Sequence, residues 1–142
     1  MASGELLASV PLFAGLDAKA LEALAGFAFS KSFEPGELIV EEGRTGNGLF
    51  ILISGRAEVV KGLKGGQPRI VATLGSGEPI GEMALLGEWP RSASVRALEK
   101  TECLGIDRWI FLSHLNKEPM LAIRMLQILA LRLAETAEKL AE

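Results

Sequence analysis

Residues 81–95 combine residue types whose spacing could bind a sugar phosphate. Gly81 has no Cβ, so a ligand can approach the backbone closely at that point. The amides of Met83 and Ala84 would then open a short helix, and the positive end of a helix dipole favours an anion. This stretch, called the cassette below, therefore predicts a site for a phosphate group.

Two charged side chains of the cassette, Glu82 and Arg91, would supply the polar recognition. The Arg91 guanidinium can donate two parallel hydrogen bonds to two phosphate oxygens, and the Glu82 carboxylate can accept one from a ribose hydroxyl. The plain alternative is that the two side chains form an ion pair in a loop that binds nothing. The glycine and the helix start beside them favour the binding site.

The cassette sequence, Gly-Glu-Met-Ala-Leu-Leu-Gly-Glu-Trp-Pro-Arg-Ser-Ala-Ser-Val, resembles the phosphate-binding cassette of cyclic nucleotide-binding domains. The resemblance implies that Glu82 binds the ribose hydroxyl. It implies that Arg91 and the amides of Met83 and Ala84 bind the cyclic phosphate, and that Ser92 adds a further polar contact. The implied ligand is a cyclic nucleotide, and we expect no separate cofactor.

Three apolar residues, Val59, Val71 and Ile80, align with the family pattern as walls near the base or the ribose. Ile80 stands where the family usually has an aromatic residue, which alters an apolar wall but removes no polar contact. Packing in the core of a barrel explains all three residues equally well. Both interpretations stay open.

The C-terminal segment adds one residue to the predicted site by resemblance. Residues 131–139 are similar to the dimer helix of the catabolite activator branch of the family, where a threonine at the position of Thr136 hydrogen-bonds the adenine amino group. Ala137 stands where that branch has a serine. Thr136 therefore favours cAMP over cGMP, whereas Ser92 fits either nucleotide. Without the resemblance, Thr136 would be interpreted as a solvated helix residue.

Length and composition indicate one globular domain over residues 1–142, with 49% apolar and 23% charged residues. The net charge of −3 and the lack of a Lys and Arg cluster argue against direct DNA binding. Residues 1–10 have no basic residue ahead of their apolar positions, and Arg124 and Arg132 interrupt the one long apolar stretch. We expect a cytoplasmic protein without a membrane segment.

An enzymatic function finds little support in the sequence. Cys103 is the single cysteine, and its alternating surroundings favour a strand with core packing over a nucleophile. His114 is the single histidine, so neither a metal site of several histidines nor a catalytic triad can be assembled. We expect neither a catalytic nor a metal-binding residue.

The spacing of apolar residues changes along the chain, and it predicts the helices and strands that must position the cassette. Residues 6–30 are expected to form a helical N-terminal segment, in which Asp17 is a plausible N-cap. The apolar residues that follow recur on one helix face: Leu21, Leu24, Ala25 and Ala28. Residues 32–107 are short apolar runs separated by glycine and proline, with a clear turn at residues 34–37. This pattern predicts a mainly β fold, an antiparallel β-roll or jelly roll similar to a cupin barrel, with flanking helices.

Residues 108–142 predict a short helix, 108–115, and a long one, 118–142. Six positions of the long helix repeat at alternating steps of three and four, as in the seam of a coiled coil. These positions, called the seam below, are Ile123, Leu126, Ala130, Leu133, Ala137 and Leu140. The first half has a second apolar face, formed by Leu121, Met125, Ile128 and Leu129. One face would pack on the roll and the seam on a second copy, giving a homodimer. The alternative is a single helix lying on its own roll.

These observations predict a sensor that binds a cyclic nucleotide and shifts its C-terminal helix. The catabolite activator branch continues into a helix-turn-helix, for which residues 1–142 leave no room. We therefore expect either a sensor that acts on a separate, unknown protein partner or a part of a longer protein. The alternative function is a structural dimerisation module whose degenerate pocket binds no nucleotide.

Overall fold

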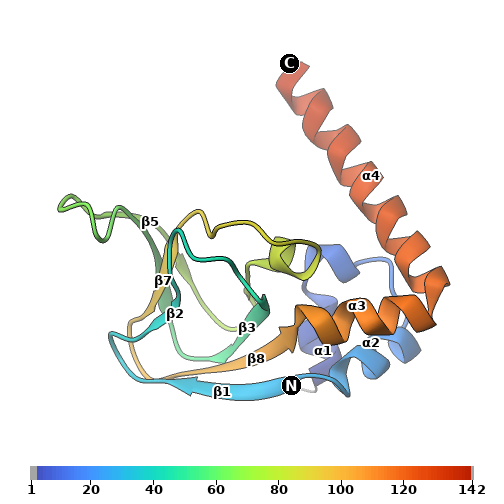
Figure 1. Cartoon of the computed structure of the whole chain (residues 1–142), viewed down its shortest axis with the longest axis horizontal. Coiled ribbons are helices and arrows are strands. Elements are labelled where there is room, and N and C mark those ends of the chain that lie inside the picture. The colour runs from blue at the N-terminus through green and yellow to red at the C-terminus, as the bar shows by residue number, and fades with distance from the viewer. Residues whose placement is uncertain (1–2, 142) are drawn as a thin grey trace.

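Two four-stranded antiparallel sheets form a β-roll in the computed structural model, which describes residues 3–141 (Figure 1). The first sheet has the order β1 (Phe29–Phe33), β8 (Thr101–Asp107), β3 (Gly48–Ser54) and β6 (Pro79–Ile80). The second has the order β2 (Leu38–Val40), β7 (Ser94–Ala97), β4 (Ala57–Lys61) and β5 (Arg69–Leu74). The predicted roll is confirmed, although its first strand begins at Phe29, three residues ahead of the predicted start at residue 32.

The first sheet has apolar side chains on both faces because it separates two cores. Successive residues of a strand point to opposite faces. On β3, Leu49 and Ile51 pack in the core beneath the helices, whereas Leu52 packs in the core inside the roll. Cys103 on β8 is fully buried inside the roll, as its alternating pattern predicted. This double burial explains the nearly continuous apolar run of β3.

The predicted turn between β1 and β2 forms at residues 34–37. The Glu37 amide donates to the Glu34 carbonyl at 3.0 Å, and Gly36 takes a φ of 89°. A positive φ at the third position, after a proline, is the geometry of a type II turn and favours glycine there. The turn thus has the predicted geometry, and it is also bonded to β7, because the Gly36 amide donates to the Ala97 carbonyl at 2.8 Å.

The N-terminal segment forms three short helical elements that cover the end of the roll (Figure 1). They are α1 (Ser3–Ala8), the 3₁₀ turn η1 (Pro11–Phe13) and α2 (Ala18–Ala25). Asp17 is the N-cap of α2, since its Oδ1 accepts from the Ala20 amide at 2.8 Å. Leu21 and Leu24 are buried as predicted, but α2 ends at Ala25, so Ala28 lies outside this helix and packs on the core from the connection to β1. The predicted boundary at residue 30 falls inside β1.

The C-terminal segment forms two helices, α3 (Arg108–Lys117) and α4 (Pro119–Ala141). α3 is two residues longer than predicted, and Glu142, the predicted end of the long helix, lies outside the described residues. Leu121 and Met125 anchor the first turns of α4 in the core, and Leu129 packs against it. The outer half of α4 projects away from the roll (Figure 1). Across residues 3–141, none of the helices has the length and apolar character needed to span a bilayer.

Candidate functional site: the cassette between β6 and β7

The cassette links β6 to β7 and begins with a left-handed glycine. Gly81 has φ 72° and ψ 42°, a conformation that glycine adopts without the steric cost of a Cβ. It is followed by a single 3₁₀ turn, η2 (Glu82–Leu85), where a short helix was expected. The Ala84 amide donates to the Gly81 carbonyl at 2.9 Å and so closes this turn. Of the two amides expected to face an anion, the Ala84 amide is thus already used.

Gly81 is also required by its contact with Arg91. A Cβ built on Gly81 would overlap the Arg91 Nη1 atom, so the guanidinium lies directly against the Gly81 backbone. The two residues are ten positions apart in the chain, and the structure brings them into contact. A side chain at position 81 would both strain the backbone and displace the arginine.

Arg91 is held by the loop that precedes β3. Its amide donates to the Arg44 carbonyl at 2.9 Å, and its Nη2 donates to the Gly48 carbonyl at 2.8 Å. The Nε and Nη1 atoms are buried and have no hydrogen-bond partner within residues 3–141. Buried donors of a charged group are expensive to leave unpaired, and an anion with several oxygens would satisfy them.

The electrostatic surroundings of Arg91 also favour an anion. Burial lowers the pKa of Arg91 from its ordinary value, and the nearby positive charge of Arg108 lowers it further. Both causes oppose the charged form of the guanidinium. A bound phosphate would compensate for both, because it places a negative charge beside two cations.

Glu82 connects three elements of the molecule. Its Oε2 accepts from the Leu12 amide of η1 at 3.1 Å, and its Oε1 lies 3.3 Å from Arg132 Nη2 of α4. Within residues 3–141, the ion pair of Glu82 is therefore with Arg132, and the alternative of a pair with Arg91 is wrong. The carboxylate of Glu82 joins the cassette to the helix that projects from the roll.

The remaining cassette and wall residues differ in their burial. Ile80 is buried in β6, and Val59 is half-buried against the core inside the roll. Val71 on β5 is 50% exposed, so the interpretation of Val71 as barrel core is wrong. Met83 and Ser92 are exposed. The exposed residues are open to contact with a ligand, and the buried ones also serve the fold.

Thr136 is exposed on the outer half of α4. Its Oγ1 donates to the Arg132 carbonyl at 2.8 Å, a bond within the helix. Residues four positions apart lie on the same face of a helix. Thr136 therefore lies one turn beyond the arginine that reaches Glu82, on the same face of α4.

A cavity of about 330 Å³ lies behind Arg91. It is bordered by residues of β1, β2, β3 and the loop before β3, among them Phe29, Ile39, Phe50 and Gly46. Arg91 borders this cavity, but the other nine predicted ligand-binding residues do not. The predicted residues are thus not gathered around this cavity.

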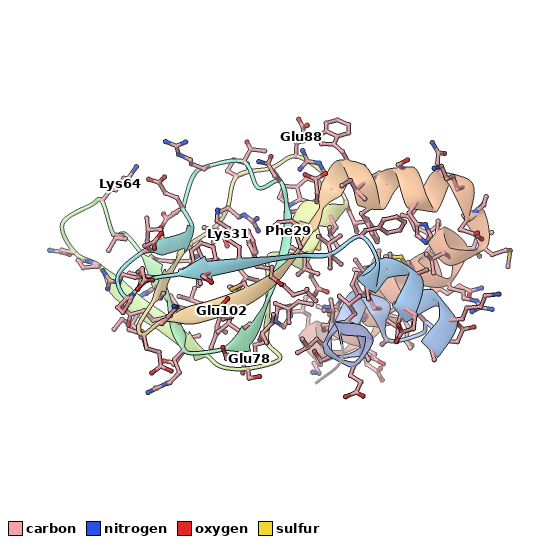
Figure 2. The ribbon with its side chains drawn as sticks, turned by 90° about the horizontal axis from the view of Figure 1, so that it is seen from below. Phe29, Lys31, Lys64, Glu78, Glu88 and Glu102 are labelled. Carbon is pink, nitrogen blue, oxygen red and sulfur yellow. The ribbon has the colours of Figure 1, made fainter. Side chains whose placement is uncertain are left out.

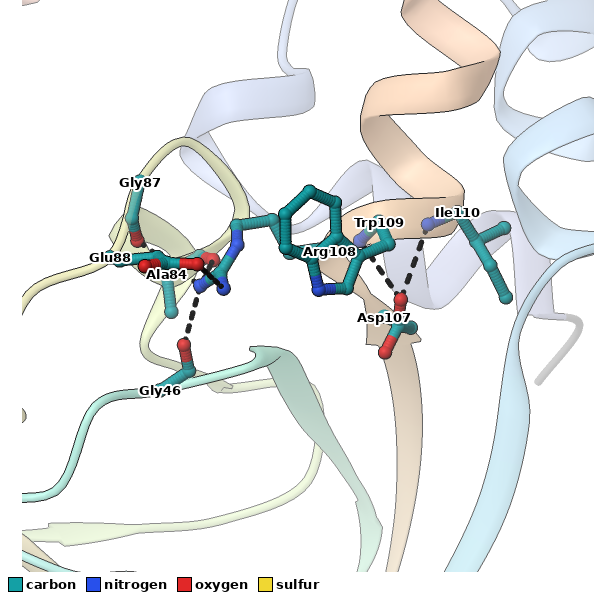
Figure 3. A network of polar contacts seen from close by, with 8 residues as sticks. All are labelled: Gly46, Ala84, Gly87, Glu88, Asp107, Arg108, Trp109 and Ile110. Atoms are coloured by element: carbon teal, nitrogen blue, oxygen red, sulfur yellow. Dashed lines mark hydrogen bonds and ion pairs between the residues drawn. The ribbon is translucent and has the colours of Figure 1, made fainter.

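Two arginines that sequence reasoning missed have central positions. Arg132 was noted only as an interruption of an apolar stretch, and its spacing of four from Thr136 was the signal that could have found it. Arg108 is only 3% exposed and makes a network of polar contacts behind the cassette (Figure 3). A charged residue within an apolar run, directly after the N-cap Asp107, was the corresponding signal.

A β-roll that carries a phosphate-type cassette and ends in a pair of helices is shared with a family of ligand-binding modules. The profile described as "Cyclic nucleotide-binding domain" matches residues 30–118, which include the whole cassette. The chain therefore belongs to the cyclic nucleotide-binding domain family. Its modules are regulatory rather than catalytic.

Three known proteins illustrate the range of the similarity. The "Cyclic AMP receptor protein" of Thermus thermophilus is 36% identical over 125 residues, which are 88% of this chain and 58% of that protein. The "cGMP-dependent protein kinase" of Eimeria tenella is 40% identical over 104 residues, 73% of this chain and 10% of the kinase. The crystal structure of the N-terminal domain of a Streptomyces coelicolor transcriptional regulator superposes with a TM-score of 0.87 at 27% identity, covering 95% of this chain and 94% of that domain. The chain thus spans less than two thirds of the first two proteins.

Proposed function

We propose that this chain binds a cyclic nucleotide at the cassette, cAMP in preference to cGMP, as one domain, and that binding shifts α4. The observation that carries the proposal is the Arg91 guanidinium, which has two buried donors without a partner among the described residues. Arg91 lies against Gly81, where only a residue without a side chain leaves room for it. A cyclic phosphate supplies the charge and the oxygens that this group lacks.

The other contacts follow from the placement of the cassette residues. Glu82 accepts from the ribose hydroxyl, Ser92 contacts a phosphate oxygen, and the Met83 amide donates to the phosphate. The Ala84 amide contributes only if the 3₁₀ turn opens, because it is bonded to the Gly81 carbonyl. The apolar walls are Val59, Val71 and Ile80.

The shift of α4 follows from the position of Glu82. A ligand changes a conformational balance only through contacts that differ between the states. A ribose hydroxyl would donate to the same carboxylate that lies 3.3 Å from Arg132, so the ligand alters the contact between cassette and helix. Thr136, one turn further along α4, would then contact the base and favour adenine.

The outer half of α4 supports a homodimer. The four large residues of the seam, Ile123, Leu126, Leu133 and Leu140, are all exposed, whereas Leu121 and Met125 on the other face are buried. The helix therefore does not bury its seam on its own roll. A second copy would bury it against the same repeat, and would bring the second α4 close to the cassette.

The alternative function is a dimerisation module that does not respond to nucleotides, and the exposed seam favours it as well. Binding separates the two functions. A protein that is only a dimerisation module would keep its dimer and give no saturable heat with a cyclic nucleotide. The preference for cAMP is supported by Thr136 and by the name of the Thermus relative. The name of the Eimeria relative is the reason to measure cGMP binding as well.

The test is isothermal titration calorimetry of the purified chain with cAMP, cGMP and non-cyclic AMP. We expect saturable binding of cAMP, weaker binding of cGMP, and the weakest binding of AMP. Arg91→Ala should weaken cAMP binding about 100-fold or more, since it removes two charge-assisted hydrogen bonds. Arg56→Ala, at an exposed arginine of the β3–β4 turn, is the matched control and should bind normally. Absence of binding with all three nucleotides would refute the proposal.

A further inference from the structure

Arg108 is a buried cation whose side chain leaves its own helix. It is the first residue of α3, yet its guanidinium extends toward the cassette and the loop before β3 (Figure 3). The Trp109 ring, 5.5 Å from the Arg108 Cζ, lies beside it. The formation of α3 does not require the Arg108 side chain to extend toward these two loops.

The Arg108 guanidinium joins the cassette to the loop before β3. Its Nη1 donates to the Gly46 carbonyl at 2.6 Å, and it lies 3.3 Å from the Gly87 carbonyl and 3.4 Å from the Ala84 carbonyl. Its Nη2 pairs with Glu88 Oε1 at 3.0 Å. The cassette contacts thus come from the end of η2 and the residues directly after it.

The loop before β3 together with Gly48, the first residue of that strand, is called the 44–48 loop, and it contacts both arginines. The Arg108 amide donates to the Asn47 carbonyl at 2.8 Å, so backbone and side chain of Arg108 both hold this loop. The same loop binds Arg91, whose Nη2 donates to the Gly48 carbonyl. A Cβ built on Gly46 would lie 2.5 Å from Arg91 Cζ, so Gly46 touches Arg91 while its carbonyl binds Arg108. Any displacement of this loop would therefore move Arg91.

We propose that Arg108 is a positioning residue that holds the 44–48 loop and the rear of the cassette together, and so orients Arg91 for an anion. This inference rests on the proposed nucleotide site and adds a second connection from that site to the helices. The first connection runs from Glu82 to Arg132 of α4, whereas this one runs from the cassette to the start of α3.

The charge of Arg108 is poorly compensated for a purely structural contact. Among residues 3–141, the carboxylate partner of Arg108 is Glu88, whose side chain is 61% exposed, and Figure 2 shows Glu88 beside the start of α3 at the surface. The other three partners of the Arg108 guanidinium within this range, the carbonyls of Gly46, Ala84 and Gly87, are neutral. A buried charge is costly unless it is fully paired, and a second cation, Arg91, is held on the same loop. A phosphate bound at Arg91 would relieve this excess of positive charge.

The experiment compares hydrogen exchange of the full chain without nucleotide in wild type, Arg108→Met and Arg108→Lys. We expect Arg108→Met to raise the exchange of residues 41–48 and 84–91 together about tenfold, and to weaken cAMP binding about tenfold, which corresponds to ~1.4 kcal/mol. Arg108→Lys keeps the charge but cannot reach both loops, so it should restore part of both quantities. Circular dichroism checks the fold, and Arg108→Lys decides alone if Arg108→Met does not fold.

The matched control is Arg96→Met. Arg96 is a half-buried arginine of β7 that pairs with Glu58, and its removal leaves both loops untouched. It should lower stability without selective exchange in residues 41–48 and 84–91. Equal exchange in Arg96→Met and Arg108→Met, or wild-type exchange in Arg108→Met, would overturn the proposal. If wild type binds no cyclic nucleotide, the proposed function fails, but the exchange comparison still decides whether Arg108 couples the two loops.

Discussion

The cassette side of the roll and the outer half of α4 are held in different ways. Arg91 and Arg108 bond to backbone carbonyls of the same loop, so the cassette is fixed by contacts from elements distant in sequence. On α4 beyond Met125, by contrast, Leu126 and Leu133 are 65% and 71% exposed. Regions with few buried contacts open and move at low free-energy cost. In the proposed function, the cassette is therefore the fixed part of the molecule, and α4 is the element that a bound ligand would move.

One ion pair joins the two regions. Glu82 Oε1 lies 3.3 Å from Arg132 Nη2, and the Arg132 side chain is partly exposed. Pairs of this kind contribute only about 0.2–1 kcal/mol. A contact this weak can be replaced by a ligand, and this makes it suitable for a switch.

The largest effect is expected from Gly81→Ala, which should disorder the cassette. The new Cβ would collide with Arg91 Nη1 and would also strain a backbone with φ 72°. We expect cAMP affinity to fall by at least about 100-fold, because the charge-assisted bonds to the phosphate are lost. Calorimetry measures the affinity.

Gly36→Ala is the matched control for that change. Gly36 has a φ of 89°, but a Cβ there would meet no atom within 4 Å. Gly36→Ala should therefore lower the free energy of unfolding by about 1–2 kcal/mol through backbone strain, without a loss of cAMP affinity. Similar affinities for the two variants would mean that Arg91 does not depend on Gly81.

The second prediction concerns the exposed region. The double variant Leu126→Asp and Leu133→Asp should raise the dimer dissociation constant by about 100-fold or more, because each leucine contributes about 1.5–3 kcal/mol when buried. Light scattering at several concentrations measures the assembly. Leu131→Asp, on the same helix but outside the seam, should leave the dimer intact. If all three proteins had the same mass, the seam would not be the interface.

The third prediction separates the two regions by removing their ion pair. Arg132→Met should change cAMP affinity by less than about fivefold, in line with the small contribution of exposed pairs. It should nevertheless abolish the nucleotide-dependent change in α4, followed by hydrogen exchange of residues 126–141. Arg124→Met removes another exposed pair of α4, with Asp17, and should keep the response. If the nucleotide still changed the exchange of α4 in Arg132→Met, the Glu82–Arg132 pair would not be the contact that links the cassette to the helix.

The smallest effect lies in the core of the roll. Burial, with a further contribution from Glu102, raises the pKa of the Cys103 thiol to about 11 from an ordinary value of 9.0. A raised pKa means that the unfolded chain loses this proton first, so stability is unaffected below pH 9 and falls as the pH rises toward 11. Between pH 8 and pH 10, wild type should lose about 1 kcal/mol relative to Cys103→Ala in urea unfolding. Equal pH dependence of the two proteins would contradict a buried, protonated thiol.

Sequence reasoning predicted what is encoded locally. The turn at Gly36, the N-cap at Asp17 and the period of the strands depend on nearby residues, and the roll and both C-terminal helices formed as expected. The contacts of Glu82 and Arg108 were not predictable in this way. They join residues separated by 50 and 62 positions, and only the packing of α4 and of the 44–48 loop brings these partners together.

The burial of single residues also depended on this packing. Val71 has the same residue type as the core residue Val60, yet β5 lies at the edge of its sheet and leaves Val71 half exposed. The use of the Ala84 amide inside a 3₁₀ turn was equally hidden, because the sequence predicted a short helix whose opening amides, Ala84 among them, would face an anion. Neighbours distant in sequence determine both features.

The most direct test of a fixed site with a movable helix is a distance measurement between the roll and α4. Spin labels at Lys31 on β1 and Lys139 near the end of α4 would be measured by pulsed electron resonance with and without saturating cAMP, in wild type and Arg91→Ala, using dilute labelled chains in excess unlabelled protein. We expect a shift and narrowing of the distance distribution in wild type and no change in Arg91→Ala. An unchanged distribution in wild type that binds cAMP would contradict the account.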